Sequence, residues 1–437
     1  MKKLLLLLMV SSIVLGGADP KLERFNEWKF GMFIHWGIYS VASVESTWPL
    51  MRPNPKRWPG MTEAVYATLP ARFHPTHFDP DAWVQLAKDA GQRYMVFTTK
   101  HHDGFCMYES SFTDYKVTKT PYGKDVLAQL AGSCQRAGMP LGFYFSMPDM
   151  HHPDYRDTSK PESENYRGEP ARPEWPLFLD FTELQLRELL TRYGPVAIVW
   201  FDNIAPFEKY TPGRYIHLIH ELQPGTLINN RLGVGGDYGT PEQKIPKGVP
   251  AKEAAGNNLA LLATPSGNLP PAQDFHPWEA CMTINGNWGY NKDDHGFKST
   301  KSLIQTLADI ASKGGNLLLD VGPTPDGTIQ PEFAERLRGM GAWLKVNGAS
   351  IYGTTFGPWQ DLPFGRSTRN GSTVYLHVFT WRAGQLEVER VAQQASSVRL
   401  LATGQPLPFH QEGGRLRIDT PASAPDENDT VLAILMR

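Results

Sequence analysis

Ionisable side chains cluster at the ends of short apolar segments of this chain. Asp202 directly follows the run VAIVWF, and His101 and His102 follow the run YMVFTTK. Arg231 comes after a third such run, TLINN. A carboxylate among imidazoles and a guanidinium group can attack an electrophilic carbon or stabilise positive charge on a substrate. An Asp at this place also commonly caps a turn, but the neighbouring polar clusters favour a nucleophile.

Cleavage of a glycosidic bond is one reaction that needs such a carboxylate together with a second one. In a retaining enzyme the second carboxyl group protonates the leaving oxygen and lies about 5–5.5 Å from the nucleophile. Two glutamates are candidates: Glu242 lies in the turn-rich segment GDYGTPE, and Glu279 begins the segment EACMT. A loop carboxylate can reach over a bound sugar, whereas one at a strand start more often has a structural role. We therefore predict Glu242 as the acid/base and keep Glu279 as the alternative.

Apolar and amphipathic segments alternate through the middle of the chain, which favours a parallel sheet covered by helices. In an eightfold barrel of this kind the chemistry lies at the carboxyl ends of the strands, which is where the polar clusters fall. We predict an α/β fold, a (β/α)8-like barrel. The expected strands are Lys29–Trp36, Tyr94–Thr99, Leu141–Met147, Val196–Phe201, Thr226–Asn230 and Asn316–Val321, and the expected helices are Pro80–Ala90, Asp125–Ala137, Phe178–Tyr193, Arg214–Leu222, Thr300–Lys313 and Glu332–Asn347.

The two ends of the chain differ from its middle. Two lysines, an apolar run from Leu4 to Leu15 and small residues up to Ala18 predict a secretory signal peptide. The run is short for a membrane span, so we expect an exported protein (periplasmic or secreted) without a membrane anchor. Beyond Gly353, alternating segments such as STVYLHVF and GRLRIDT predict an antiparallel β-sandwich. The predicted domains are a signal peptide at 1–18, a catalytic barrel at 19–353 and a C-terminal β-sandwich at 354–437.

Composition excludes several classes of protein. A net charge of -2 gives no electrostatic footprint for nucleic acid. Three cysteines, Cys106, Cys134 and Cys281, are too few for a disulfide scaffold and lack the spacing of a zinc site. The pair His101 and His102 has no further ligand at a metal-binding spacing, so we predict no metal. The sequence does not indicate an oligomeric state.

Seven blocks of sequence, in this order along the chain, resemble the α-L-fucosidases of glycoside hydrolase family 29. They are RFNEWKFGMFIHWGIYS, FTTKHHDGFCMYES, VWFDN, INNR, GDYGTPEQ, WEACMTINGNWGYN and GGNLLLDVGPTPDGTI. The resemblance covers nearly the whole mature length. It implies a (β/α)8-like catalytic barrel, a C-terminal β-sandwich, retention of anomeric configuration, and no metal or organic cofactor.

The resemblance also implies roles for individual residues. Asp202 matches the nucleophile, and Glu242 matches the loop position of the acid/base. The other matching residues would form the sugar pocket. In it His35, His101 and His102 hold the fucose hydroxyls, Trp48 matches a conserved indole, Trp200 is a wall, Arg231 lies near the acid, and Trp288 faces the C6 methyl group.

The chain departs from the family pattern at a few positions. It has Thr47 before Trp48, where many relatives carry a glutamate that contacts sugar hydroxyls. Glu45 is a candidate to replace that carboxylate. Asn203 stands where glycine is more usual, and the long segment Pro246–Pro277 could shape the aglycone side of the cleft.

These observations predict a retaining exo-α-L-fucosidase that forms a covalent fucosyl-enzyme intermediate on Asp202. Its partner is a fucosylated oligosaccharide or glycoconjugate. L-Fucose carries hydroxyl groups and an apolar methyl group, and a pocket of imidazoles and indoles suits both. Two alternatives stay open: a retaining glycosidase for a related sugar such as galactose, and a non-catalytic carbohydrate-binding protein on the same fold.

Overall fold

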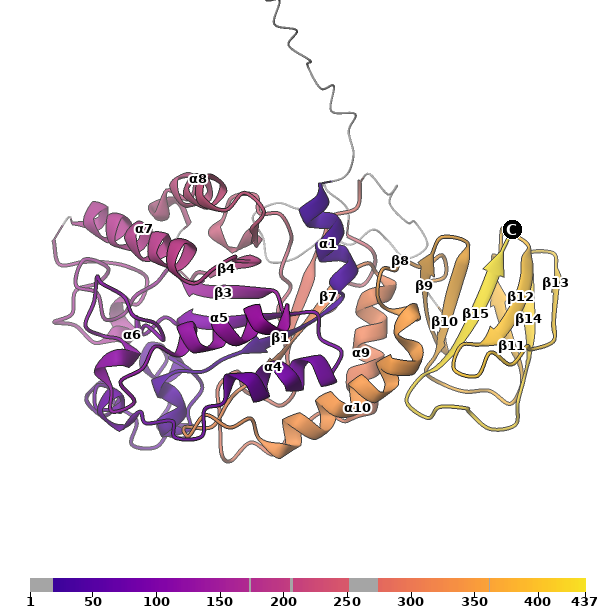
Figure 1. Ribbon diagram of the computed structural model, residues 1–437, viewed down its shortest axis with the longest axis horizontal. Coiled ribbons are helices and arrows are strands. Elements are labelled where there is room, and N and C mark those ends of the chain that lie inside the picture. The colour runs from indigo at the N-terminus through magenta and orange to yellow at the C-terminus, as the bar shows by residue number, and fades with distance from the viewer. Residues whose placement is uncertain (1–18, 173, 205–206, 251–273, 361) are drawn as a thin grey trace, which may run out of the picture.

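The computed structural model describes residues 19–437 except 173, 205–206, 251–273 and 361. The predicted signal peptide and most of the predicted long loop therefore lie outside the described residues. Figure 1 shows a larger body of helices around a sheet, joined through α9 and β8 to a smaller body made of strands. The barrel-plus-sandwich fold class is confirmed, whereas the predicted domain boundaries stay predictions.

The larger body contains a parallel sheet of seven strands in the order β5-β4-β3-β2-β1-β7-β6. Nearly every residue of these strands is buried, which explains why they read as continuous apolar runs in the sequence. All six predicted strands are present, and a seventh begins at Glu279. The strands are β1 Phe30–Ile34, β2 Tyr94–Lys100, β3 Leu141–Ser146, β4 Ile198–Asp202, β5 Leu227–Ile228, β6 Glu279–Thr283 and β7 Asn316–Val321.

An irregular segment, residues 237–243, closes the gap between the two outer strands β5 and β6. The Asp237 amide donates to the Ile228 carbonyl (2.7 Å), and the Gln243 amide donates to the Cys281 carbonyl (3.0 Å). Between them, the Glu279 amide donates to the Gly239 carbonyl (2.8 Å). The predicted eightfold barrel is thus completed by isolated bridges instead of a regular eighth strand, and this closing segment carries Glu242.

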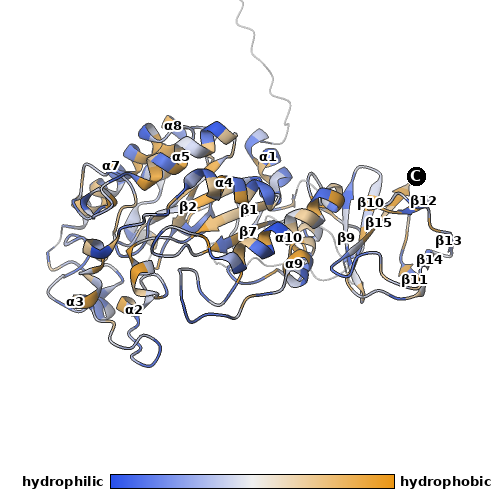
Figure 2. Ribbon diagram, turned by 60° about the horizontal axis from the view of Figure 1, so that its bottom comes forward, coloured by the Kyte–Doolittle hydropathy of each residue, from blue (hydrophilic) through white to orange (hydrophobic). Residues whose placement is uncertain are grey.

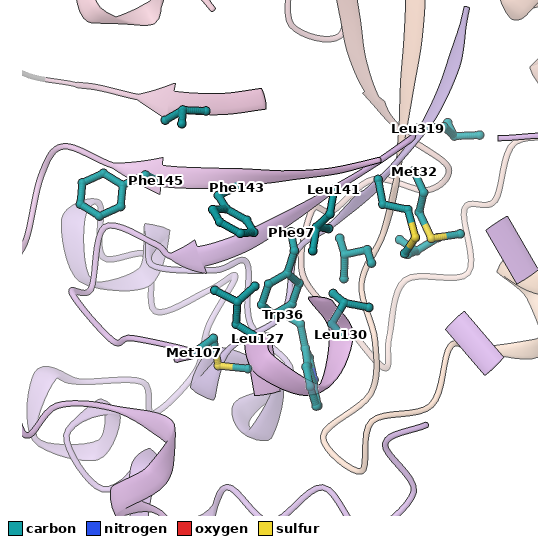
Figure 3. Packing of buried hydrophobic residues seen from close by; sticks show 14 of the residues in the cluster. Met32, Trp36, Phe97, Met107, Leu127, Leu130, Leu141, Phe143, Phe145 and Leu319 are labelled. Atoms are coloured by element: carbon teal, nitrogen blue, oxygen red, sulfur yellow. The ribbon is translucent and has the colours of Figure 1, made fainter. Parts of the chain in front are cut away.

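Six long helices cover the sheet, close to where the sequence predicts them. Several begin at a side-chain cap, as where the Asp125 carboxylate accepts from the Ala128 amide (2.8 Å). Figure 2 shows their hydrophobic faces turned to the sheet, and Figure 3 shows Leu127 and Leu130 packing toward Phe97 and Phe143. These helices are α4 Pro80–Asp89, α5 Val126–Ala137, α7 Trp175–Arg192, α8 Gly213–Leu222, α9 Thr300–Ser312 and α10 Pro331–Asn347, and short helices α2 Trp48–Met51, α3 Glu63–Tyr66 and α6 Glu162–Asn165 lie in the connections.

Helix α1 (Pro20–Trp28) was not predicted. Its sequence, PKLERFNEW, is short and largely polar, although Leu22, Phe25 and Trp28 recur at a helical spacing. Its two buried residues, Phe25 and Trp28, pack against Tyr94 at the amino end of β2. The partly buried Leu22 packs against the same cluster, so one face of the helix covers that end of the barrel.

Two antiparallel sheets form the smaller body, as predicted. One has the order β12-β15-β10-β9-β8 and the other β11-β14-β13. A buried pair, His377 Nδ1 and Asp429 Oδ2 (2.7 Å), lies where this body meets α10, and the Trp343 indole of α10 donates to the Asp429 carbonyl (3.0 Å). The strands are β8 Thr355–Phe356, β9 Gly365–Asn370, β10 Thr373–Val378, β11 Gly384–Glu389, β12 Ala395–Leu400, β13 Phe409–Glu412, β14 Arg415–Thr420 and β15 Thr430–Met436.

The packing of α10 on α4 requires a glycine at position 341. A Cβ atom on Gly341 would lie 1.8 Å from the Asp89 carbonyl oxygen, which cannot move away without shifting backbone. We expect Gly341→Ala to lower the free energy of unfolding by about 1–3 kcal/mol, as overpacking usually does. Gly132→Ala in α5 is the matched control, because its nearest contact is the flexible tip of Arg136 at 3.4 Å. Denaturant unfolding followed by circular dichroism would contradict the packing argument if both variants were equally stable.

Candidate active site

A pocket of about 240 Å³ lies at the carboxyl ends of the barrel strands. A larger cavity of about 540 Å³ lies at the opposite end of the barrel, but its lining contains no carboxylate. The smaller pocket combines carboxylates, imidazoles and aromatic rings, so it is the better candidate for chemistry. It is lined by Phe33, His35, Trp48, His101, His102, Tyr144, Trp200, Asp202, Asn203, Ile204, Arg231, Glu242, Cys281 and Trp288.

Asp202 is the last residue of β4, and its carboxylate is held from several sides. Oδ1 accepts from Arg231 Nη1 (3.0 Å) and from the Asn203 amide (3.0 Å), and Oδ2 accepts from the Tyr144 hydroxyl (2.8 Å). Burial would raise the pKa of Asp202, but the Arg231 guanidinium and the Tyr144 hydroxyl outweigh it and hold the pKa below its usual value. Asp202 is therefore an ionised carboxylate at neutral pH, oriented toward the pocket.

One guanidinium group joins the two carboxylates of the pocket. Arg231 Nη1 contacts Asp202, and Arg231 Nη2 contacts Glu242 Oε2, each at 3.0 Å. The Arg231 guanidinium also lies over the Trp200 ring at 4.4 Å, and Nε donates to Thr240 Oγ1 (3.0 Å). Asp202 and Glu242 differ in exposure: the Glu242 side chain is 43% exposed and that of Asp202 is 17% exposed. One carboxylate is thus embedded in the pocket and the other reaches over it from the closing segment.

Glu279 lies outside the pocket, beneath it in the barrel interior. Its Oε1 accepts from the Trp200 indole (2.9 Å) and its Oε2 accepts from the Tyr94 hydroxyl (2.5 Å). The residue is fully buried, and burial raises its pKa to about 7. Glu279 therefore supports Trp200 from below, which favours Glu242 over Glu279 as the acid/base.

The three histidines of the pocket share one arrangement, in which Nδ1 faces a polar partner behind the pocket wall. Burial lowers the pKa of His35 to about 4 and also lowers the pKa of His101 and of His102. All three are therefore neutral imidazoles, which can donate to or accept from a hydroxyl group. The partners are Asp320 for His35 (2.7 Å), Thr47 for His101 (3.1 Å) and Ser146 for His102 (2.6 Å).

Aromatic rings form the remaining walls. Trp288 lies beside His35, with ring centroids 5.0 Å apart, and beside Phe33 at 6.1 Å. The Trp288 amide donates to Glu45 Oε1 (2.9 Å), so Glu45 holds this wall in place. Glu45 does not line the pocket. The carboxylate that Thr47 lacks is therefore not supplied to the pocket lining by Glu45.

All nine residues predicted for catalysis and sugar binding line this one pocket, and the alternative, Glu279, does not. Sequence reasoning missed Tyr144, which appears in the sequence as one more apolar residue of a strand. Its signal is the strand register: Tyr144 is the partner of Trp200 across β3 and β4, on the face already predicted to form the pocket.

Known proteins resemble this chain in sequence and in fold. A family model described as alpha-L-fucosidase matches residues 17–349. The plasma alpha-L-fucosidase of Homo sapiens is 30% identical over 416 residues, covering 88% of this chain and 82% of that protein. The alpha-L-fucosidase isoenzyme 1 of Paenibacillus thiaminolyticus has a TM-score of 0.84 at 33% identity, covering 96% of this chain and 99% of that one. A family 29 alpha-L-fucosidase of Bacteroides thetaiotaomicron was trapped as a covalent intermediate with 2-fluoro-fucosyl fluoride. Its structure has a TM-score of 0.80 at 28% identity, and the match covers 96% of this chain and 97% of that one.

Without the Arg231 guanidinium, the buried Asp202 carboxylate should lower the stability of the fold instead of adding to it. In Arg231→Met, burial is no longer offset, so we expect the pKa of Asp202 to rise above its unfolded value of about 3.9. The variant should lose about 3–5 kcal/mol of stability at pH 7, as when one partner of a buried pair is removed. This loss of stability in Arg231→Met is present at pH values above the pKa that Asp202 has in the unfolded chain. It becomes smaller as the pH falls, because the folded variant then binds a proton at Asp202 and no longer buries an unpaired charge.

Denaturant unfolding at pH 7 and at pH 4.5 checks this expectation. The stability gap between Arg231→Met and the unmodified protein should narrow at the lower pH. The double variant Asp202→Asn with Arg231→Met provides the control, because it has no buried carboxylate to titrate at this position. A gap that is the same at both pH values would contradict the electrostatic account.

Proposed function

This chain belongs to the α-L-fucosidases of glycoside hydrolase family 29, and from this membership and the pocket geometry we propose that it retains configuration, with Asp202 as nucleophile and Glu242 as acid/base. The observation that carries the proposal is the bridge from Arg231 to both carboxylates, each at 3.0 Å. It brings together two acids that are far apart in the sequence, one largely buried and ionised and one partly exposed. Such a pair is what a two-step glycosidase requires.

In the first step the Asp202 carboxylate attacks the anomeric carbon, while Glu242 gives its proton to the leaving glycosidic oxygen. The bond from the anomeric carbon to that oxygen breaks, and an ester to Asp202 forms. In the second step Glu242 removes a proton from water, the water oxygen attacks the anomeric carbon, and the ester bond breaks to release Asp202. Negative charge thus passes from Asp202 to Glu242 and back. Arg231 lies between them and stabilises the charge at either end of its transfer.

The pocket dimensions support action on a terminal sugar. A volume of about 240 Å³ is below the roughly 300–1,000 Å³ of pockets that hold drug-sized ligands, which suits a single sugar ring. The imidazoles of His35, His101 and His102 bind hydroxyl groups, and Trp288 and Phe33 provide apolar surface for the methyl group. The substrate is therefore a terminal α-linked fucose on an oligosaccharide or glycoconjugate.

Export is part of the proposal and is supported by the residues that precede Asp19. A charged start, an apolar run and small residues are typical of a secretory leader. Within the part of the chain that the structure describes, no helix has the length and apolarity needed to cross a membrane. One relative is named a plasma alpha-L-fucosidase.

Two measurements test the proposed function. The enzyme should hydrolyse an aryl α-L-fucoside far faster than an aryl β-D-galactoside, which distinguishes fucose from a related sugar. Proton NMR of the first-formed product should show the α-anomer of fucose. Release of the β-anomer first would contradict a retaining mechanism, and binding of fucose without hydrolysis would indicate a carbohydrate-binding protein.

Asp202→Asn should lower turnover of the aryl fucoside by several powers of ten, because the ester can no longer form. Calorimetry should show that fucose still binds, since the other walls of the pocket are unchanged. Asp180→Asn is the matched control, because Asp180 is an exposed carboxylate on α7 that pairs with Arg214. Turnover near the normal rate in Asp202→Asn would refute the nucleophile assignment.

Glu242→Ala should slow the hydrolysis of substrates with poor leaving groups much more than that of activated aryl fucosides, since only the former need a proton donor. Azide should restore activity by attacking the intermediate in place of activated water. Glu279→Gln provides the comparison. Because it disturbs Trp200, it should slow the hydrolysis of both types of substrate to the same extent, and azide should not restore the activity. The reverse pattern would assign the acid/base to Glu279.

A further inference from the structure

His102 and His35 face different chemical groups behind the pocket wall. The Ser146 hydroxyl lies 2.6 Å from the Pro148 carbonyl oxygen and 2.6 Å from His102 Nδ1. Two oxygens at that distance need a proton between them, and a carbonyl has none, so Ser146 donates its only proton to Pro148. Ser146 can then only accept from His102, which fixes the proton of this imidazole on Nδ1. In the neutral ring, Nε2 carries a lone pair toward the pocket.

His35 has an acid behind it. Its Nδ1 lies 2.7 Å from Asp320 Oδ1, and both residues are almost fully buried. His35 directly follows β1, and Asp320 lies on the neighbouring strand β7. Asp320 forms no ion pair with Lys or Arg among the described residues. The charge of Asp320 would raise the pKa of the nearby Glu45 carboxyl group. Burial raises the pKa of Asp320 well above its usual value. The uncharged form of the pair is therefore favoured, with one proton between Oδ1 and Nδ1 and a second on Nε2.

We propose that Asp320 and Ser146 give the two imidazoles opposite hydrogen-bond polarity, so that His35 presents an Nε2–H donor to the sugar and His102 presents an Nε2 acceptor. This inference rests on the proposed function, because it concerns recognition of the same bound sugar. Asp320 is then a positioning residue that acts through His35. The hydroxyl facing His35 must accept a hydrogen bond, and the hydroxyl facing His102 must donate one.

The place of His102 indicates which hydroxyl it binds. His102 Nε2 lies 3.4 Å from Asp202 Oδ2. With the proposed tautomer, both atoms are acceptors that lie side by side where the anomeric carbon would bind. The sugar hydroxyl nearest the anomeric carbon is the 2-hydroxyl, and it can donate its proton there. Hydrogen bonds to this hydroxyl strengthen in the transition state of glycoside cleavage, so a fixed acceptor at His102 favours the reacting state.

His101 differs from both, because its partner can act in either direction. Thr47 Oγ1 lies 3.1 Å from His101 Nδ1, and its other neighbour is the weakly accepting Met51 sulfur at 3.9 Å. The hydroxyl proton of Thr47 can therefore point to either atom. His101 can therefore serve as donor or acceptor. His35 and His102 each require one hydrogen-bond direction of the hydroxyl that they bind, whereas His101 accepts either direction.

Nitrogen-15 NMR of the histidine-labelled free enzyme tests the assignment without any substitution in the pocket. We expect His35 Nε2 at a protonated, pyrrole-type shift and His102 Nε2 at an unprotonated, pyridine-type shift, both at pH 6.5. A pyridine-type Nε2 in His35, or a protonated Nε2 in His102, would overturn the proposal. Hydrolysis of aryl fucoside by the same sample is measured separately, so failure of the proposed function is distinguished from failure of this inference.

Kinetics of fluorinated substrates provides the second test. Fluorine can accept a hydrogen bond weakly but cannot donate one, so at the hydroxyl facing His35 a fluoro sugar should bind better than the deoxy sugar. His35→Ala identifies this hydroxyl among the 3- and 4-hydroxyls of the sugar. In that variant, removing the hydroxyl that faces His35 should cause no further rise in KM. Asp320→Leu should raise KM about tenfold and abolish the preference for fluoro over deoxy, while Asp320→Asn, whose amide can donate to Nδ1, should restore it.

The chain contains a matched control for Asp320. His377 and Asp429 form a buried pair with the same 2.7 Å separation, remote from the pocket. Asp429→Leu removes a carboxyl group from behind a buried imidazole, as Asp320→Leu does, and should leave KM and the fluoro-to-deoxy ratio unchanged. A fluoro-to-deoxy ratio that survives Asp320→Leu would overturn the role of Asp320, whatever the effect of that variant on stability.

Discussion

The bridge from Arg231 to Asp202 and Glu242 is the interaction on which the pocket depends. Burying a carboxylate at the end of a hydrophobic strand costs several kcal/mol unless a cation and hydrogen bonds compensate. Arg231 provides that compensation because its planar guanidinium can face two carboxylates at once, which a lysine ammonium cannot do with the same geometry. The Trp200 ring at 4.4 Å fixes the plane of the guanidinium. The Glu279 carboxylate in turn fixes Trp200 by accepting from its indole. The buried Glu279 therefore helps to position the exposed Glu242, through Trp200 and Arg231.

The irregular closure of the barrel follows from the different exposures that the two acids need. Asp202 sits at the end of a regular strand, where burial is nearly complete. As the proposed acid/base, Glu242 must face solvent and substrate together. The closing segment 237–243 permits this because it is held to β5 and β6 by isolated bridges and side-chain hydrogen bonds. Gln243, the next residue, has a φ of 52°, a strained value for a residue other than glycine. Strain of this kind collects at functional sites, and here it lies directly beside the proposed acid/base.

Much of this arrangement can be read from the sequence, because parallel strands bring their carboxyl ends to one edge. Asp202, His101 and Arg231 were found as polar residues that end apolar runs. Asp320 and Tyr144 could not be found in this way, since each lies inside an apolar run and gains its partner only when strands align. The choice of Glu242 over Glu279 could be predicted, because the turn-rich sequence around Glu242 indicates an exposed loop and Glu279 begins a strand. Helix α1 is harder to predict because it is only nine residues long and its apolar face consists of Leu22, Phe25 and Trp28.

The substitution of a threonine at position 47 has a consequence for how the pocket balances charge. Thr47 lies behind His101, so a carboxylate there would place a third negative group beside a cavity that already holds Asp202 and Glu242 around a single guanidinium. Thr47 avoids that repulsion and leaves the proposed binding of hydroxyls to the neutral imidazoles. A neutral imidazole has one donor and one acceptor, so its direction must be fixed by the group behind it. In this pocket the second layer, Asp320 and Ser146, therefore carries part of the specificity that a carboxylate would otherwise supply directly.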